Sequence, residues 1–308
     1  MMNSLQRFLW AATVVAAGCG RFDFASLTLR DDAAGDGAEA GDANRADAAP
    51  LCAFGAFSPP RLSDTLNSAD IDWGPSLSAD QLTVVFSSHP SSGAPTLLTS
   101  TRASTTTVWA MRLPIESSTG SITGEDPFLS RDGLTLYYDH AGIHQLTRAA
   151  VGQTWANETI VASDTGQYTE PSSPELTNDD LHLLFSAHVT AEGGTPHLFT
   201  AKRANPGASF ATATEITELS TSAGEASPSI TTDGLEVFFQ QLDTTRGVFH
   251  AARATTADPF GPPVLLTELG NFGDHKVDAD ISVDGKTLAF SSDKNGSYDV
   301  WFATRECL

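Results

Sequence analysis

The chain has 308 residues, of which 40% are hydrophobic, and its formal net charge is −21. This acidic balance argues against nucleic acid as a partner, because phosphates require a basic surface, and against a basic patch that docks on anionic lipid. It is compatible with a solvated acidic surface and with basic partners. The length suffices for one large domain or two ordinary ones.

The first residues predict an exported lipoprotein. Arg7 precedes an apolar run over residues 8–17, which is too short to span a bilayer but suits the core of a signal peptide. The run ends in AAGC at residues 16–19, which resembles a bacterial lipobox with Cys19 as the lipidated residue, although Ala16 stands where a larger aliphatic residue is usual. The alternative is ordinary signal-peptide cleavage that leaves Cys19 as a free thiol.

We therefore expect three segments. Residues 1–18 are a lipoprotein signal peptide, residues 19–51 are a flexible acidic tether, and residues 52–308 are a folded domain. The tether is rich in Ala, Gly and Asp, so it cannot bury enough apolar surface to offset its ordering entropy. A lipid at Cys19 would anchor the protein to a membrane without a transmembrane helix. Gly20, rather than Asp, follows it and implies an outer-membrane anchor, with the protein facing the periplasm or the cell surface.

From residue 52 onward the chain repeats a pattern about 51 residues long. Each copy has a Ser/Thr-x-Asp turn, in which Asp can bond to its own backbone and a following Gly supplies a positive φ. An aliphatic residue lies three positions before the turn Asp, and an aromatic residue lies six positions after it. Short apolar runs around each turn predict three antiparallel strands. The turn aspartates are Asp80, Asp132, Asp179, Asp233 and Asp284.

A second spacing predicts a fourth strand and a closed ring. The third strand of each copy ends at an Arg, and in the first four copies an aromatic residue follows seven positions later, ahead of a short apolar segment. The fifth copy stops before this segment, but residues 57–62 resemble residues 260–265 and can supply it. The sequence therefore predicts an all-β propeller of five four-stranded blades, in which an N-terminal strand completes the last blade. A degenerate sixth blade is the alternative.

The two remaining cysteines support this closure. Cys52 lies five residues before its aromatic residue and Cys307 lies two residues after its Arg, so both occupy the same place in the seven-residue interval. Export would place them in an oxidising compartment. We expect a disulfide between Cys52 and Cys307 rather than two free thiols.

Residues 278–301 (DADISVDGKTLAFSSDKNGSYDVW) resemble the WD-repeat-like propeller repeat of bacterial periplasmic proteins. This repeat occurs in the Tol-system translocation propeller and in the propeller domains of prolyl oligopeptidase-type enzymes. The resemblance covers about residues 52–308 and implies the fold, but it names no ligand. Members of the family commonly have six or seven blades, and Gln81 and Asp180 replace the turn Gly here.

Acidic residues precede each turn, where the innermost strand of a propeller blade begins near the central channel. They could form an anionic ring that attracts a metal, a sugar or a basic peptide. The alternative is that they cap turns and bind backbone amides of the neighbouring blade. These candidate channel acids are Asp72, Glu125, Asp126, Glu170, Glu225, Asp278 and Asp280.

The sequence does not favour catalysis or a metal site. It has no helical zinc motif, no nucleophile elbow and no phosphate-binding glycine loop. The oxygen-bearing side chains between Asp293 and Asp299 suggest calcium only loosely, because the EF-hand glutamate is missing and the segment fits a hairpin turn. We therefore expect no cofactor, no metal and no identifiable catalytic residue.

Two functions follow from these observations. The first is a non-catalytic, membrane-anchored envelope propeller, monomeric as a domain, whose loops bind or scaffold a protein or glycan partner. The alternative is a carbohydrate-active enzyme of the glycoside hydrolase type that uses channel carboxylates such as Asp72, Glu170 and Glu225. An enzyme would need two carboxylates about 5–10 Å apart in an open pocket.

Overall fold

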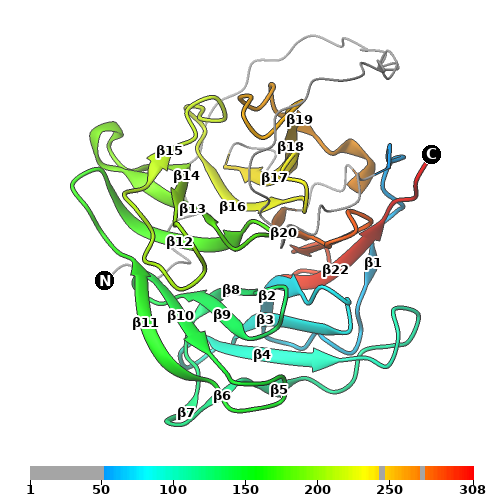
Figure 1. Cartoon of the computed structure of the whole chain (residues 1–308). Coiled ribbons are helices and arrows are strands. Elements are labelled where there is room, and N and C mark those ends of the chain that lie inside the picture. Colours follow the sequence, from blue (N-terminus) through cyan, green and yellow to red (C-terminus); the bar gives the residue numbers. More distant parts are fainter. Residues whose placement is uncertain (1–51, 243–246, 271–274) are drawn as a thin grey trace, which may run out of the picture. The chain divides into compact units, whose positions relative to one another are not determined.

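The computed structural model describes residues 52–242, 247–270 and 275–308. The predicted signal peptide, Cys19 and the tether lie outside the described residues. The described chain is an all-β propeller of five antiparallel four-stranded sheets, so the prediction of five blades is confirmed. In Figure 1 the five innermost strands, one from each blade, surround the middle of the ring.

Blades 1–4 are each built from four strands that follow one another in the chain. Blade 1 has β2 (Ile71–Leu77), β3 (Thr83–His89), β4 (Thr96–Thr101) and β5 (Leu113–Pro114). Blade 2 has β8 (Glu125–Leu129), β9 (Thr135–Asp139), β10 (Ile143–Thr147) and β11 (Ala156–Ala162). Blade 3 has β12 (Tyr168–Leu176), β13 (His182–Val189), β14 (Thr195–Lys202) and β15 (Thr214–Glu215). Blade 4 has β16 (Glu225–Ile230), β17 (Glu236–Gln241), β18 (Val248–Ala252) and β19 (Val264–Leu265).

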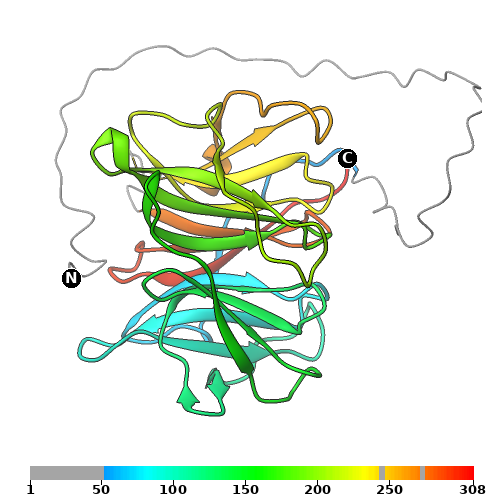
Figure 2. The same ribbon diagram turned by 60° about the vertical axis from the view of Figure 1, so that its left-hand side comes forward.

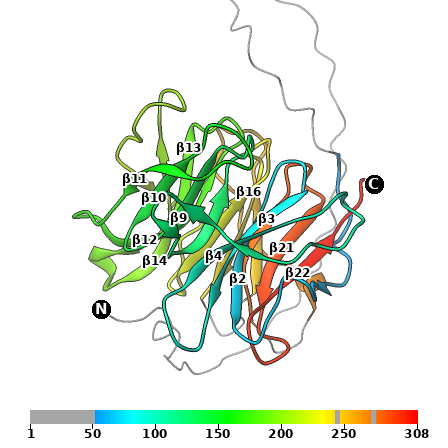
Figure 3. The same cartoon turned by 90° about the horizontal axis from the view of Figure 1, so that it is seen from below.

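Blade 5 combines the two ends of the described chain, as the sequence predicts. Its inner three strands are β20 (Lys276–Ile281), β21 (Thr287–Ser292) and β22 (Asp299–Thr304), and its outer strand is β1 (Arg61–Leu62). Arg61 lies opposite Phe302 and Leu62 lies opposite Trp301 in this antiparallel pair. Figure 3 shows the beginning of the described chain, in blue, next to the C-terminal strand, in red.

The elements outside the blades are small. A hairpin of β6 (Glu116–Ser117) and β7 (Gly120–Ser121) projects from the periphery of the ring, as Figure 2 shows. Two short 3₁₀ helices cover Thr190–Glu192 and Thr267–Leu269. In the part of the chain that the structure describes, no helix has the length and apolar character needed to cross a membrane.

The predicted turns close each innermost strand by the same hydrogen bonds. In blade 1, Ser78 Oγ donates to Asp80 Oδ1 at 2.6 Å, and the same carboxylate oxygen accepts the N–H of Leu82 at 2.9 Å. The residue after each turn Asp has a positive φ, which Gly adopts without strain in three copies. Gln81 and Asp180 adopt it in the other two, at φ values of 57° and 56°.

The arginine at the end of each third strand ties that turn to the outer strand. Its Nε–H donates to the carbonyl of the residue after the turn Asp, as Arg148 does to Gly133 at 2.8 Å. Its guanidinium also stacks on the aromatic residue seven positions later, as Arg148 does on Trp155 at 4.3 Å. The same pair of contacts recurs at Arg102, Arg203, Arg253 and Arg305. The seven-residue spacing therefore reflects a cation–π contact in every blade.

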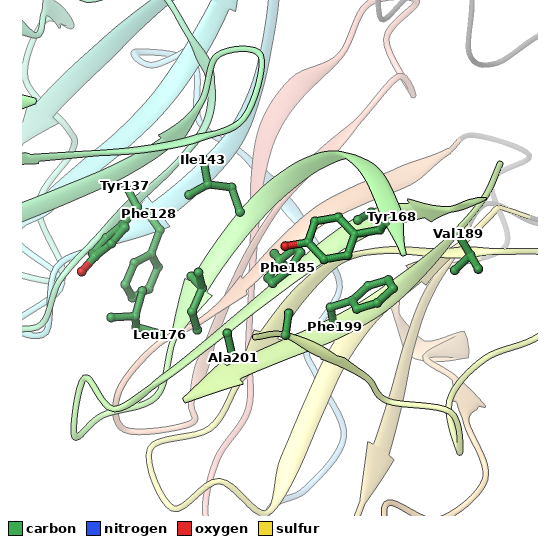
Figure 4. Packing of buried hydrophobic residues seen from close by; sticks show 12 residues of the cluster. Phe128, Tyr137, Ile143, Tyr168, Leu176, Phe185, Val189, Phe199 and Ala201 are labelled. Atoms are coloured by element: carbon green, nitrogen blue, oxygen red, sulfur yellow. The ribbon is translucent and has the colours of Figure 1, made fainter. Parts of the chain in front are cut away.

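Five apolar cores hold the ring together, one between each pair of neighbouring blades. Each of these cores combines side chains of two successive blades. Figure 4 shows the core between blades 2 and 3, where Phe128 and Tyr137 face Leu176, Phe185 and Phe199. The aromatic and aliphatic residues at the repeated positions thus contribute to the cores between blades.

Candidate functional site

The central channel is shaped by a bulge that recurs in all five innermost strands. Six residues before each turn Asp, the chain takes a positive φ and the pairing with the second strand shifts register. Only one of these positions is a glycine, and a side chain there would meet the backbone of the next blade, because a Cβ on Gly74 would lie 3.1 Å from Asp126 Cα. The five positions are Gly74, Asp126, Ser173, Ser227 and Asp278.

Together with the two residues that follow it in four of the strands, and with Pro228 alone in β16, this position lines a cavity on the axis of the ring. The cavity encloses about 40 Å³, enough for only a few water molecules. Of the predicted channel acids, Asp126, Asp278 and Asp280 line it, whereas Asp72, Glu125, Glu170 and Glu225 are not among its lining residues.

The first layer of the cavity is a chain of hydrogen bonds around the axis. Ser173 donates to Asp126 at 2.8 Å, and Ser227 donates to Asp278 at 2.6 Å. The two serine oxygens lie 3.4 Å apart, so side chains of four blades are joined. Burial, and then the negative charge of Asp126, raise the pKa of Asp278 well above its usual range. Burial in this layer therefore favours the protonated form of Asp278.

The second layer joins neighbouring blades through backbone amides. In four of the five blades, the side chain two residues after the bulge accepts the N–H of the residue three positions before the turn Asp in the next blade, whereas Phe128 takes this position in blade 2. Ser76 accepts from Leu129 at 3.2 Å, and Ser229 accepts from Ile281 at 3.0 Å. Across the ring closure, Asp280 accepts from Leu77 at 3.0 Å. Asp280 thus binds a backbone amide of the neighbouring blade, which is the structural role that the sequence left open for these acids.

Glu175 occupies the same position in blade 3 and was not predicted as a channel acid. Its Oε1 accepts from Ile230 N and Ser229 Oγ at 3.5 and 3.4 Å. The signal was available, since Glu175 and Asp280 both lie four residues before their turn Asp. Only the bulge reveals that this position faces the axis.

Glu175 and Asp280 interact electrostatically in this layer. Burial raises the pKa of both carboxyls, to about 7 for Asp280, and the charge of Asp280 adds to the effect on Glu175. The positive charge of Arg131, from the turn after β8, acts in the opposite direction on both. Nε and Nη2 of Arg131 are buried without a hydrogen-bond partner in the described structure. Burial therefore favours the protonated forms of these two carboxyls, against the charge of Arg131.

Asp72 and Glu225 are buried anchors for the loops that precede β2 and β16. Asp72 accepts from Ser68 N and Ser68 Oγ at 2.7 and 2.8 Å, and Arg112 Nη1 lies 2.8 Å from its other oxygen. Glu225 accepts from Thr221 N and Thr221 Oγ1 at 3.2 and 2.5 Å. In both cases the partner lies four residues earlier, so these acids fix the start of an innermost strand.

The last two predicted acids lie beside histidines nearer the surface. Glu125 Oε1 is 3.6 Å from His89 Nε2, and Glu170 Oε2 is 3.6 Å from His188 Nε2. Burial lowers the pKa of His89 to about 4, so His89 is neutral at pH 7. The structure therefore distributes the seven predicted acids over three environments instead of one ring.

The described residues contain no group of three or more histidine, cysteine or acidic side chains placed to hold a metal ion. In the hairpin that the sequence compared with a calcium loop, Asp293 accepts from the N–H of His275 at 2.7 Å, and Asn295 donates to Asp299 at 3.4 Å. Within the turn, the N–H of Gly296 donates to Asp293 O at 2.8 Å, which is the hydrogen bond of a hairpin turn, whereas His275 lies just before the neighbouring strand β20.

Comparison with known proteins identifies the fold but no family. No family model and no curated protein matches the sequence. Among solved structures, the α-L-arabinofuranosidase PaAbf62A from Podospora anserina is similar with a TM-score of 0.53 and 10% identity, over 83% of this chain and 97% of that one. A thermostable family-43 glycoside hydrolase is similar with a TM-score of 0.54 and 8% identity, over 80% and 92%. TolB from Acinetobacter baumannii has a TM-score of 0.45 and 13% identity, over 78% and 56%. At such identities, these similarities concern the fold alone.

Proposed function

We propose that the protein is a non-catalytic propeller that binds or scaffolds a protein or glycan partner in the cell envelope, held there by a lipid on Cys19. The proposal rests on the structural hydrogen bonds that four of the buried acids make. Asp280 and Glu175 bind amides of neighbouring blades, and Asp72 and Glu225 anchor loops.

The size of the cavity supports the same proposal. Pockets for small ligands typically measure about 300–1,000 Å³, and the axial cavity encloses about 40 Å³. Binding would then fall to the loops on the faces of the ring, since a rigid scaffold commonly presents function on its loops.

The alternative is a glycoside hydrolase that uses Asp126 and Asp278 in the first layer. One observation favours it, namely the raised pKa of Asp278 beside Asp126, because a general acid needs a carboxyl that is protonated at neutral pH. The similarity to two glycosidases concerns the fold alone and adds no catalytic residue.

A panel of envelope and plant polysaccharides separates the two functions. The protein and its Asp278→Asn variant are incubated with each glycan, and reducing ends and binding are measured in parallel. We expect no release of reducing ends by either protein and equal binding by both. If the parent protein cleaved a glycan and Asp278→Asn did not, the scaffold proposal would be wrong and the glycoside hydrolase would be the function.

The membrane anchor has its own test. Metabolic labelling with a palmitate analogue should mark the parent protein, which should fractionate with membranes. The Cys19→Ala variant should be unlabelled and released into the soluble envelope fraction. A labelled Cys19→Ala protein, or an unlabelled parent, would contradict lipidation at this residue.

A further inference from the structure

The ring closure differs from the other four blades in one covalent respect. In blades 1–4 a continuous peptide connects the arginine to the aromatic residue seven positions later, as from Arg203 to Phe210. In blade 5 the peptide is interrupted at this interval, and the Cys52–Cys307 disulfide joins the two ends with a Cα–Cα distance of 5.5 Å. This disulfide confirms the predicted pair, and it replaces the loop that the other blades have.

Non-covalent contacts hold the two ends in register beside the disulfide. The N–H of Gly55 donates to Glu306 O at 2.9 Å, and the N–H of Leu308 donates to Ala53 O at 2.9 Å. The outer strand itself is short, because β1 pairs with β22 only at Arg61 and Leu62. The disulfide adds a covalent link to these contacts.

Arg305 is the main non-covalent clamp of this closure. Its guanidinium stacks on Phe54 at 4.0 Å and on Phe57 at 4.8 Å, both of which belong to the N-terminal segment. It also pairs with Glu236 of blade 4 at 2.7 Å. Residues 52–62 are thus attached through this guanidinium, through backbone hydrogen bonds that include Ser58 N–H to Thr304 O at 2.6 Å, through burial of Phe57 in the core between blades 4 and 5, and through the disulfide.

The disulfide is accessible to a reductant in the folded protein. Cys307 is exposed and Cys52 is half-buried, and Leu308 beside Cys307 is 90% exposed. Thiol–disulfide exchange requires that a thiolate reach one of the two sulfurs, and exposed disulfides are the labile ones. The bond can therefore be attacked without prior unfolding of the ring.

We propose that the Cys52–Cys307 disulfide is a redox latch that determines whether the propeller ring is closed. A dithiol reductant attacks Cys307 Sγ and displaces the Cys52 thiolate, and its second thiol then releases Cys307, so that the reductant is oxidised to a disulfide as the protein disulfide becomes two thiols. In the reduced protein, residues 52–62 leave blade 5 and expose the edge of β22. In a reducing compartment the chain is an open ring, and oxidation closes it.

Hydrogen exchange of the full chain tests this latch. The Cys19→Ala background leaves Cys52 and Cys307 as the only thiols. With dithiothreitol, we expect amide exchange in residues 52–62 and 299–304 to accelerate about a hundredfold or more, because loss of so long a cross-link removes most of the closure free energy. Exchange in β12–β14, on another blade, should change little. Equal exchange in the reduced and oxidised proteins would overturn the proposal.

The rate of reduction distinguishes a latch from a purely structural disulfide. We expect dithiothreitol to reduce the native protein at a rate proportional to its concentration and unchanged by urea well below the unfolding midpoint. A reduction rate that follows the global unfolding rate would contradict the latch. As the matched control, Cys52→Ser/Cys307→Ser in the same background should show the fast exchange without reductant and no response to dithiothreitol.

Discussion

At equivalent positions on the axis, different side chains accept a hydrogen bond from a backbone amide of the next blade. Ser76 and Ser229 accept the amide of the next blade with a neutral hydroxyl, whereas Glu175 and Asp280 do so with a carboxyl that must lose its hydration. Burying an unpaired charge is costly, so these carboxyls respond by taking up a proton. The stability of the ring should therefore depend on pH through the second layer.

Asp280→Asn isolates this dependence. Because the pKa of Asp280 is raised from 3.8 to about 7, its favourable contribution is complete below pH 3.8 and is lost as the pH rises through about 7. Asparagine keeps the acceptor for Leu77 N–H but does not ionise. We expect the variant and the parent to have the same free energy of unfolding near pH 4. At pH 8 the free energy of unfolding of the variant should be higher by roughly 2–4 kcal/mol.

Urea unfolding at pH 4, 5.5, 7 and 8 measures this difference. Ser87→Ala is the control, since it removes a buried hydrogen bond to the carbonyl of Trp73 at 3.2 Å rather than one to a carboxyl, and its effect should not vary with pH. A constant difference between Asp280→Asn and the parent across this range would refute the proton uptake.

Glu236 shows the opposite behaviour outside the channel. Burial alone would raise its pKa, but hydrogen bonds and charges of His250 and Arg305 outweigh it and lower the pKa of Glu236 to about 2. The ionised carboxylate of Glu236 therefore stabilises the folded protein above pH 4.5, and this stabilisation is lost as the pH falls towards 2. Glu236→Gln should therefore lower the free energy of unfolding by about 2 kcal/mol at pH 7, and by progressively less as the pH falls from 4.5 to 3.

Thermal unfolding over this pH range is the appropriate measurement. Glu306→Gln is the control, because the Glu306 side chain is 87% exposed and should contribute little at any pH. If Glu236→Gln lowered the stability equally at pH 7 and pH 3, the ion pair with Arg305 would not be its cause.

At the scale of the element, the arginine in each blade connects the turn to the aromatic residue, because it donates a hydrogen bond to the turn and stacks on the aromatic ring. The spacing in the sequence predicted the strands, the turns and the place of the aromatic residue, because these follow from local periodicity and turn chemistry. It did not predict that Arg148 stacks on Trp155 while it binds Gly133. That contact joins residues whose proximity depends on the completed sheet.

Arg148→Lys tests the element directly. Lysine keeps the charge but cannot donate the Nε–H bond to Gly133 and stack its planar group on Trp155 at the same time. We expect a loss of about 1–2 kcal/mol in unfolding free energy by urea titration. Arg61→Lys, at an exposed position of β1, should be neutral. If both variants were equally stable, the stack would be incidental.

The bulge of the innermost strands marks the limit of prediction from the sequence. Pattern alone placed Asp126 and Asp278 at the start of their strands, but it could not decide which acids face the axis. The local left-handed turn at these positions changes which side chains point inward. Asp72, only two residues before Gly74, is therefore tied to a loop, while Glu175, two residues after Ser173, faces the cavity.

At the scale of the whole molecule, the ring is cyclic, so its break can be moved. The native break lies inside blade 5, and β1 therefore crosses the junction between the two chain ends and pairs with β22. A closure of this kind leaves no unpaired blade edge at the junction. A break placed between two blades would lack such a strand, and only an apolar core and the axial hydrogen bonds would hold the junction.

Two circular permutants compare these breaks. In both, a short linker joins Leu308 to Cys52, whose neighbours are already hydrogen-bonded through Leu308 N–H and Ala53 O at 2.9 Å. The first opens the chain between Pro206 and Gly207, inside the interval from Arg203 to Phe210, so that β15 crosses the new junction as β1 crosses the native one. The second opens it between Thr165 and Gly166, in the loop between blades 2 and 3.

The first permutant should unfold within about 5 °C of the parent, because every blade keeps its four strands and its arginine stack. The second should melt at a clearly lower temperature, since no strand crosses the junction, which is held by the core of Phe128, Leu176 and Phe185 and by the axial hydrogen bond between Ser173 and Asp126. Circular dichroism melts of both proteins with the disulfide intact give the comparison. If both permutants melted together, the shared strand would not contribute to closure, and the apolar cores between blades would account for the integrity of the ring.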